Sequence, residues 1–171
     1  MGVKYHRLQT PAMVRFRHLA AVTTGMTFAL ILLGVYTAAA GAGLSCGANW
    51  PLCNGGVFGL FPANWPSFIE WFHRLVAMIT GFMILGTTYA AWRGGRSRRT
   101  RLASALALVV LPVQILLGGA TVTVYTALVQ VTHHAAALVI FAALVATTVW
   151  AYESSDESHA STDTAAPTTA D

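Results

Sequence analysis

The sequence predicts an all-α protein, an integral membrane four-helix bundle. The first observation is composition, since 56% of the 171 residues are hydrophobic and only 9% are charged, far from the balance of a soluble domain. The second is that four apolar stretches are each long enough to cross hydrocarbon about 30 Å thick, which needs roughly 20 residues. These stretches are residues 18–40, 69–92, 102–123 and 127–152. They predict a multi-pass protein of the cell membrane whose transmembrane domain covers residues 18–152.

The first stretch follows a basic N-terminus, residues 1–17, and has two interpretations. It resembles a signal peptide because Ala38-Ala39-Ala40 looks like a cleavage site. Its apolar core, however, is longer than the roughly 7–15 residues of such a signal. We therefore interpret residues 18–40 as a retained helix.

Basic residues predict how the helices are oriented. Lysine and arginine precede the first stretch and fill the short link 93–101, whereas the connection 41–68 has no charged residue. The positive-inside rule then places both termini and the link 93–101 in the cytoplasm, and the loop 41–68 outside. Nucleic-acid binding is not favoured, because these arginines would lie against the membrane face and its lipid headgroups.

The segment 153–171 changes to serine, threonine, alanine and acidic residues. Such a composition cannot bury enough apolar surface to order itself. We expect a disordered acidic cytoplasmic tail.

A short repeat suggests two related helical hairpins. The string Ile-Leu-Leu-Gly occupies residues 31–34 and again 115–118, and in each case the next stretch carries histidine near its start. Repeated hairpins are common in membrane proteins, although leucine-rich tetrads also recur by chance. The second copy continues as Gly118-Gly119, which would let a neighbouring helix or a flat ligand approach the backbone closely.

Ionisable residues inside a membrane are costly, so each one suggests a function. Glu70 is the only carboxylate before the tail, and His73, His133 and His134 are the histidines well inside the stretches. At roughly 1.5 Å per residue, His73 lies roughly 8 Å and His133 roughly 9 Å from the outer ends of their helices. Inward imidazoles at one depth on separate helices suit axial ligation of haem iron. The alternative is that His73 pairs with Glu70 and that His133 bonds a backbone carbonyl.

Two neighbouring residues have more than one interpretation. His134 is rotated about 100° from His133 around the helix, so the two cannot face one iron; His134 is an alternative ligand, or a partner for a haem propionate or another protomer. Arg74 is either the partner of Glu70, one turn away, or a paired donor to a propionate. The sequence does not decide between these roles.

The two cysteines, Cys46 and Cys53, both lie in the outer loop 41–68. An oxidising compartment and a short spacing favour a disulfide over two free thiols. A bridge there would stiffen the loop above the outer helix ends.

These motifs together resemble the haem A synthase family. The resemblance runs from about residue 32 to about residue 149 and rests on the cysteine loop 46–55, on Glu70-x-x-His73-Arg74, and on the segment 128–133. It implies a half-length, four-helix enzyme that oxidises the C8 methyl group of haem O to the formyl group of haem A by successive hydroxylations. The product would serve a haem-copper terminal oxidase.

The resemblance also implies roles for particular residues. His73 and His133 would be the axial ligands, Glu70 the acidic group near the reacting edge, and Cys46 with Cys53 the outer-loop pair. The arginine that some relatives carry after Tyr-Thr in the first helix is replaced here by Ala38, so its role does not transfer.

The same resemblance implies cofactor and partners. Full-length members resemble two fused halves, one holding substrate haem and the other a haem b cofactor. One half supplies one histidine pair, so we expect a homo-oligomer, most simply a dimer. A haem O synthase and the terminal oxidase are the further partners expected.

Other functions share some of these features. A small bis-histidine cytochrome b that carries electrons, or a noncatalytic haem chaperone, would need the same histidines. A quinone-linked thiol oxidase normally relays electrons between two dithiol pairs, and only one pair exists here. For the synthase itself, six-coordinate iron has no open position. Either His73 or His133 leaves transiently, or the macrocycle is oxidised while Glu70 acts as general base.

Overall fold

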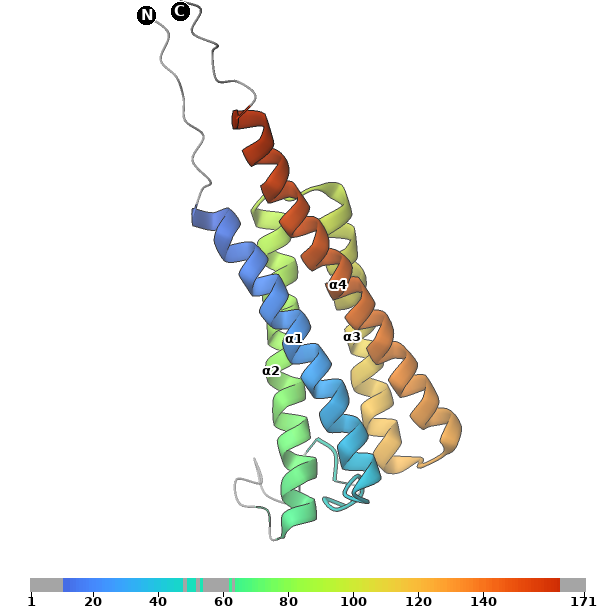
Figure 1. Ribbon diagram of the computed structural model, residues 1–171. Helices are drawn as coiled ribbons and strands as arrows, with labels where there is room; N and C mark the ends of the chain where they lie inside the picture. Colours follow the sequence, from blue (N-terminus) through green and yellow to red (C-terminus); the bar gives the residue numbers. More distant parts are fainter. Residues whose placement is uncertain (1–10, 48, 52, 54–61, 63, 164–171) are drawn as a thin grey trace, which may run out of the picture.

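A computed structural model describes residues 11–47, 49–51, 53, 62 and 64–163, with side chains omitted for 11–14 and 155–163. The described part is all-helical and forms one elongated antiparallel bundle (Figure 1). Its four helices are α1 (Pro11–Ala39), α2 (Trp65–Arg93), α3 (Arg98–Thr123) and α4 (Ala127–Asp163). Each is long and apolar enough to cross a membrane. The predicted fold class, a multi-pass membrane four-helix protein, is confirmed.

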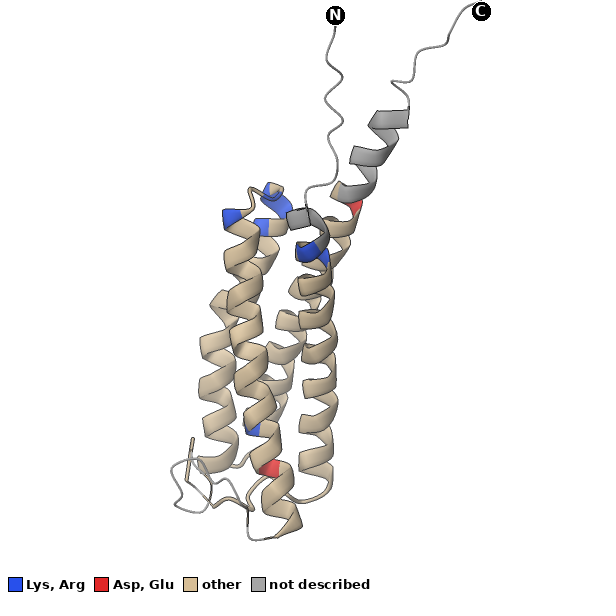
Figure 2. Ribbon diagram, turned by 90° about the vertical axis from the view of Figure 1, so that its left-hand side faces the viewer, with Lys and Arg blue, Asp and Glu red and all other residues tan. Residues whose placement is uncertain are grey.

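The helices form a closed ring. Each contacts the next along the chain, and α1 also contacts α4, whereas the diagonal pairs α1 with α3 and α2 with α4 do not touch through their backbones. The link between α2 and α3 lies at the same end as the start of α1 and the end of α4, and most of the ribbon coloured for Lys and Arg lies at this terminal end (Figure 2). Arg74 is an exception, because it lies in the first half of α2. We call the terminal end the inner end and the opposite end the outer end; their sidedness in the membrane remains a prediction.

Capping residues extend two helices beyond the apolar stretches. α2 begins at Trp65 because the Asn64 side chain accepts a hydrogen bond from the Ser67 N–H at 3.0 Å. α3 begins at Arg98, where the Ser97 hydroxyl accepts from the Thr100 N–H at 3.3 Å. Such caps satisfy N–H groups that have no partner inside the helix. The expected loops 41–68 and 93–101 are therefore shorter than predicted.

The fourth helix corrects the expected tail. α4 continues to Asp163, so residues 153–163, expected to be disordered, are helical; residues 164–171 lie outside the described part. Adding a residue to an existing helix gains a hydrogen bond without a new nucleation cost. Composition alone misses this because it treats the segment as if it stood by itself.

The inner half of the bundle is closely packed. Its core contains Ile84, Ala107, Ile140 and Leu144, and threonine hydroxyls link neighbouring helices. Thr23 bonds Thr87 across α1 and α2 at 2.9 Å, Thr24 bonds Thr148 across α1 and α4 at 2.9 Å, and Thr88 donates to the Ser104 carbonyl of α3 at 2.9 Å. Such hydrogen bonds help to hold a membrane bundle together, because an apolar side chain gains little from moving out of lipid and into contact with another helix.

The outer half is packed differently. No residue in the segments 28–36, 71–79 and 108–139 is buried, and we call these segments the open layer. On the α1–α2 side, the open layer lies between the inner core and a second group of buried residues in the outer loop and the start of α2, including Cys46, Ile69 and Glu70. The histidines predicted to carry function lie in this layer.

Candidate functional site

Two imidazoles come from diagonally opposite helices, His73 from α2 and His133 from α4. They lie near enough to interact electrostatically. In each ring, Nδ1 is buried and has no hydrogen-bond partner within the described part of the chain. Measured from the observed helix starts at roughly 1.5 Å per residue, His73 lies about 12 Å and His133 about 9 Å along their helices. The depths are similar, although less closely matched than expected.

Each ring lies against a glycine of the preceding helix. A Cβ built on Gly34 of α1 would come within 3.0 Å of His73 Cε1, and one built on Gly118 of α3 within 3.4 Å of His133 Cε1. Both glycines end the repeated Ile-Leu-Leu-Gly string. The repeat therefore has a physical meaning, since it lets a histidine of the next helix approach the backbone in both hairpins.

His134 is occupied by its own helix. Its Nδ1 lies 2.7 Å from the Gln130 carbonyl, one turn earlier, and its ring is perpendicular to that of His133 with the centroids 5.9 Å apart. The histidine that bonds a backbone carbonyl is thus His134, whereas His133 has a different partner.

That partner is Gln114 of α3, which the sequence analysis did not identify. Its amide nitrogen lies 3.3 Å from His133 Nε2, and its carbonyl oxygen is buried without a partner within the described residues. Two features of the sequence could have identified it. An amide in the middle of an apolar helix is uncommon, and Gln114 precedes Gly118 by one turn and so shares its helix face.

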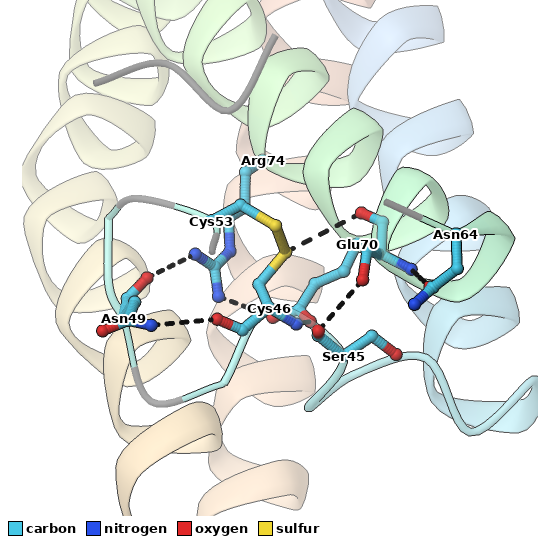
Figure 3. The surroundings of a disulfide bond; sticks show 8 residues. Ser45, Cys46, Asn49, Cys53, Asn64, Glu70 and Arg74 are labelled. Atoms are coloured by element: carbon cyan, nitrogen blue, oxygen red, sulfur yellow. Dashed lines mark hydrogen bonds and ion pairs between the residues drawn. A yellow bond between two sulfur atoms is a disulfide. The ribbon is translucent and has the colours of Figure 1, made fainter. Parts of the chain in front are cut away.

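Glu70 and Arg74 bind the outer loop (Figure 3). One carboxylate oxygen of Glu70 pairs with Arg74 at 2.5 Å, and the other accepts from the Cys46 N–H at 2.7 Å. Arg74 also donates to the Asn49 carbonyl at 2.9 Å. Glu70 is buried and His73 does not pair with it, so its carboxylate holds α2 to the loop.

The loop itself is closed by the predicted disulfide, which the structure confirms between Cys46 and Cys53. Its backbone is tied to α2 by the Ser67 hydroxyl, which donates to the Ser45 carbonyl at 3.0 Å. Trp50 of the loop lies against α3, where a Cβ on Gly119 would come within 3.3 Å of its ring. The loop therefore contacts the helices that follow it on two sides.

The donor set fits a macrocycle better than a bare metal ion. Within the described residues, no three side chains of His, Cys, Asp or Glu gather around one point. Haem brings four in-plane nitrogens and needs only axial ligands from the protein. The site is compatible with haem on three counts. Each of the two imidazoles has an unpartnered nitrogen, a glycine lies behind each ring, and the surrounding layer contains no buried residue.

The fold and site define a multi-pass membrane protein with a histidine on each of two diagonally opposite helices and a disulfide-closed outer loop. The chain belongs to the COX15-CtaA family of cytochrome oxidase assembly proteins, whose family model matches residues 63–170. This agrees with the predicted resemblance to haem A synthases.

Individual relatives fall into two groups. Haem A synthase of Bacillus licheniformis is 32% identical over 137 residues, covering 79% of this chain and 45% of that protein. Protohaem IX farnesyltransferase of Halobacterium salinarum is 38% identical over 133 residues, covering 77% of this chain and 28% of that protein. A Haloarcula marismortui protein with the latter name is 31% identical over 155 residues, covering 91% of this chain and 33% of that protein. The chain spans less than half the length of these relatives.

Proposed function

We propose that this chain acts in haem A synthesis, oxidising the C8 methyl group of haem O to a formyl group for a haem-copper terminal oxidase. The observation that carries the proposal is the placement of His73 and His133 on diagonally opposite helices, both in the open layer of the bundle. Family membership supports the same activity. With water as the oxygen source, converting the methyl to the formyl group releases four protons and four electrons, so an electron acceptor is required.

In this proposal the two histidines, Glu70 and Arg74 each have a role. His73 and His133 bind the haem iron through one ring nitrogen each, and Gly34 and Gly118 fix the distance of each ring from the neighbouring backbone. When bound, haem supplies the redox-active iron and macrocycle. Glu70 takes up a proton released at the methyl group, and Arg74 holds the carboxylate rather than a propionate.

The test is co-expression with a haem O synthase, followed by chromatographic identification of the extracted haems. We expect haem A to appear with the wild-type chain. Reversible haem b without haem A or a hydroxylated haem would contradict the synthase and favour the electron-carrying cytochrome b. Haem O recovered unchanged would favour the haem chaperone.

The relatives support a haem O synthase as partner. Three proteins named protohaem IX farnesyltransferase match 72–91% of this chain but only 27–33% of their own length. A unit similar to this chain therefore occurs within longer chains that carry that name. We propose that the haem O synthase lies beside this protein in the membrane, so that its apolar product passes between them without leaving the bilayer.

The described helices supply one histidine pair on opposite helices, and a synthase that uses a haem b cofactor beside its substrate needs two. We propose that a second copy of the chain supplies the other pair, most simply in a homodimer. One copy would then hold haem O and the other haem b.

Gly34→Ala is expected to weaken haem binding, because its new Cβ would lie 3.0 Å from the His73 ring and would force that ring to shift. Gly25→Ala is the matched control on α1, since nothing lies within 4 Å of the position that its new Cβ would take. Haem titration of the purified proteins, followed by absorption, measures the difference. Equal affinity in the two variants would show that Gly34 does not position His73.

A further inference from the structure

The two histidines of the site, His73 and His133, differ in their hydrogen-bond partners. The Gln114 amide nitrogen lies 3.3 Å from His133 Nε2. An amide nitrogen can only donate, so His133 Nε2 accepts with its lone pair and the ring proton resides on Nδ1. No hydrogen bond reaches the His73 ring from the residues that the structure describes.

Packing behind the rings shows the same asymmetry. The Cβ position of Gly34 is 3.0 Å from His73, whereas that of Gly118 is 3.4 Å from His133. The first distance means that the His73 ring lies unusually close to the α1 backbone, and the second is nearer to an ordinary contact. The His133 ring therefore lies slightly farther from the backbone of its neighbouring helix than the His73 ring does.

We propose that His133 is the exchangeable axial ligand of the haem and that Gln114 is the positioning residue that receives its imidazole. This inference rests on the proposed function. With haem bound, an Nε2 that is not on the iron would keep its lone pair and would accept the N–H of Gln114, the contact that the structure shows. The proton on Nδ1 does not move and no electron is transferred. His73 would then be the residue that still holds the haem, and the iron would be able to bind a further ligand.

The Gln114 side chain suits this role. Its carbonyl oxygen has no hydrogen-bond partner within the described part of the chain, so no second bond holds the amide away from His133. It lies one turn before Gly118 on α3, on the face that meets His133. Gln114 thus stabilises the released imidazole of His133 from α3, the helix that packs beside α4.

Carbon monoxide binding to the haem-loaded, reduced protein of residues 1–171 tests the proposal, because carbon monoxide needs an open iron position. A hydrogen bond of ordinary net strength changes an equilibrium constant by roughly fivefold. We expect Gln114→Leu to bind carbon monoxide about fivefold more weakly than wild type, and Gln114→Asn, whose amide is one methylene shorter, to show a similar loss. Gln130→Leu is the matched control, since Gln130 contacts the site through its backbone carbonyl, and it should bind as wild type does.

The absorption spectrum without carbon monoxide separates this inference from the function it rests on. All four proteins should show the low-spin spectrum of bis-histidine haem, which also shows that the variants fold. Unchanged carbon monoxide affinity in both Gln114 variants overturns the role of Gln114. A low-spin wild type that binds no carbon monoxide overturns the exchange of His133 as well, and leaves the proposed function standing. Absence of the low-spin spectrum from wild type overturns both proposals.

Discussion

Replacing His73 with alanine is expected to abolish the low-spin bis-histidine spectrum of the haem-loaded protein. The expected loss is complete, because an alanine methyl cannot ligate iron and no further histidine in the described part of α1, α2 or α3 lies in the open layer. His133→Ala should have the same effect from the opposite helix. The loss is measured from absorption and electron paramagnetic resonance spectra. The proteins are purified from cells that are supplied with haem.

His134→Ala is the matched control on α4. Its ring bonds the Gln130 carbonyl at 2.7 Å, so its removal should leave the low-spin spectrum intact. If His134→Ala lost the spectrum while His133→Ala kept it, the assignment of the axial ligand on α4 would have to be exchanged. If all three variants kept it, the iron would be bound elsewhere.

The fold was predictable from the sequence because apolar length alone determines where a chain crosses a membrane. The helix ends were not, since they depend on polar caps outside the apolar stretches. Asn64 and Ser97 begin helices several residues before the hydrocarbon requires them. The extension of α4 to Asp163 was missed for the related reason that helix propagation does not need apolar residues.

The sequence predicted those parts of the site that contain residue types rare in membrane helices. Glu70, the histidines and the cysteines stand out in an apolar chain, and their chemistry limits what they can do. The contacts of Gln114 and of Gly34 depend on how each helix is rotated toward its neighbours. Helices that are apolar on nearly every face carry little information about that rotation. Only the structure pairs each glycine with a histidine.

Glu70→Gln is expected to destabilise the outer loop and to reduce haem A formation. The Glu70 and Arg74 side chains are 4% and 15% exposed, and removing one charge of such a buried pair typically costs about 3–5 kcal/mol. The lower end is expected here, because Arg74 keeps its bond to the Asn49 carbonyl. Thermal unfolding measures the loss of stability, and extraction of haems from co-expressing cells measures the loss of product.

These two effects of Glu70→Gln have different causes, and a double variant separates them. Changing Arg74 to glutamine as well removes the unpaired buried charge, so most of the stability should return. If Glu70 accepts a proton from the substrate, haem A formation should stay low in this double variant, because an amide does not act as a base near neutral pH. If product returns together with stability, Glu70 acts only by holding the loop to α2, and the proton acceptor must be sought elsewhere in the site.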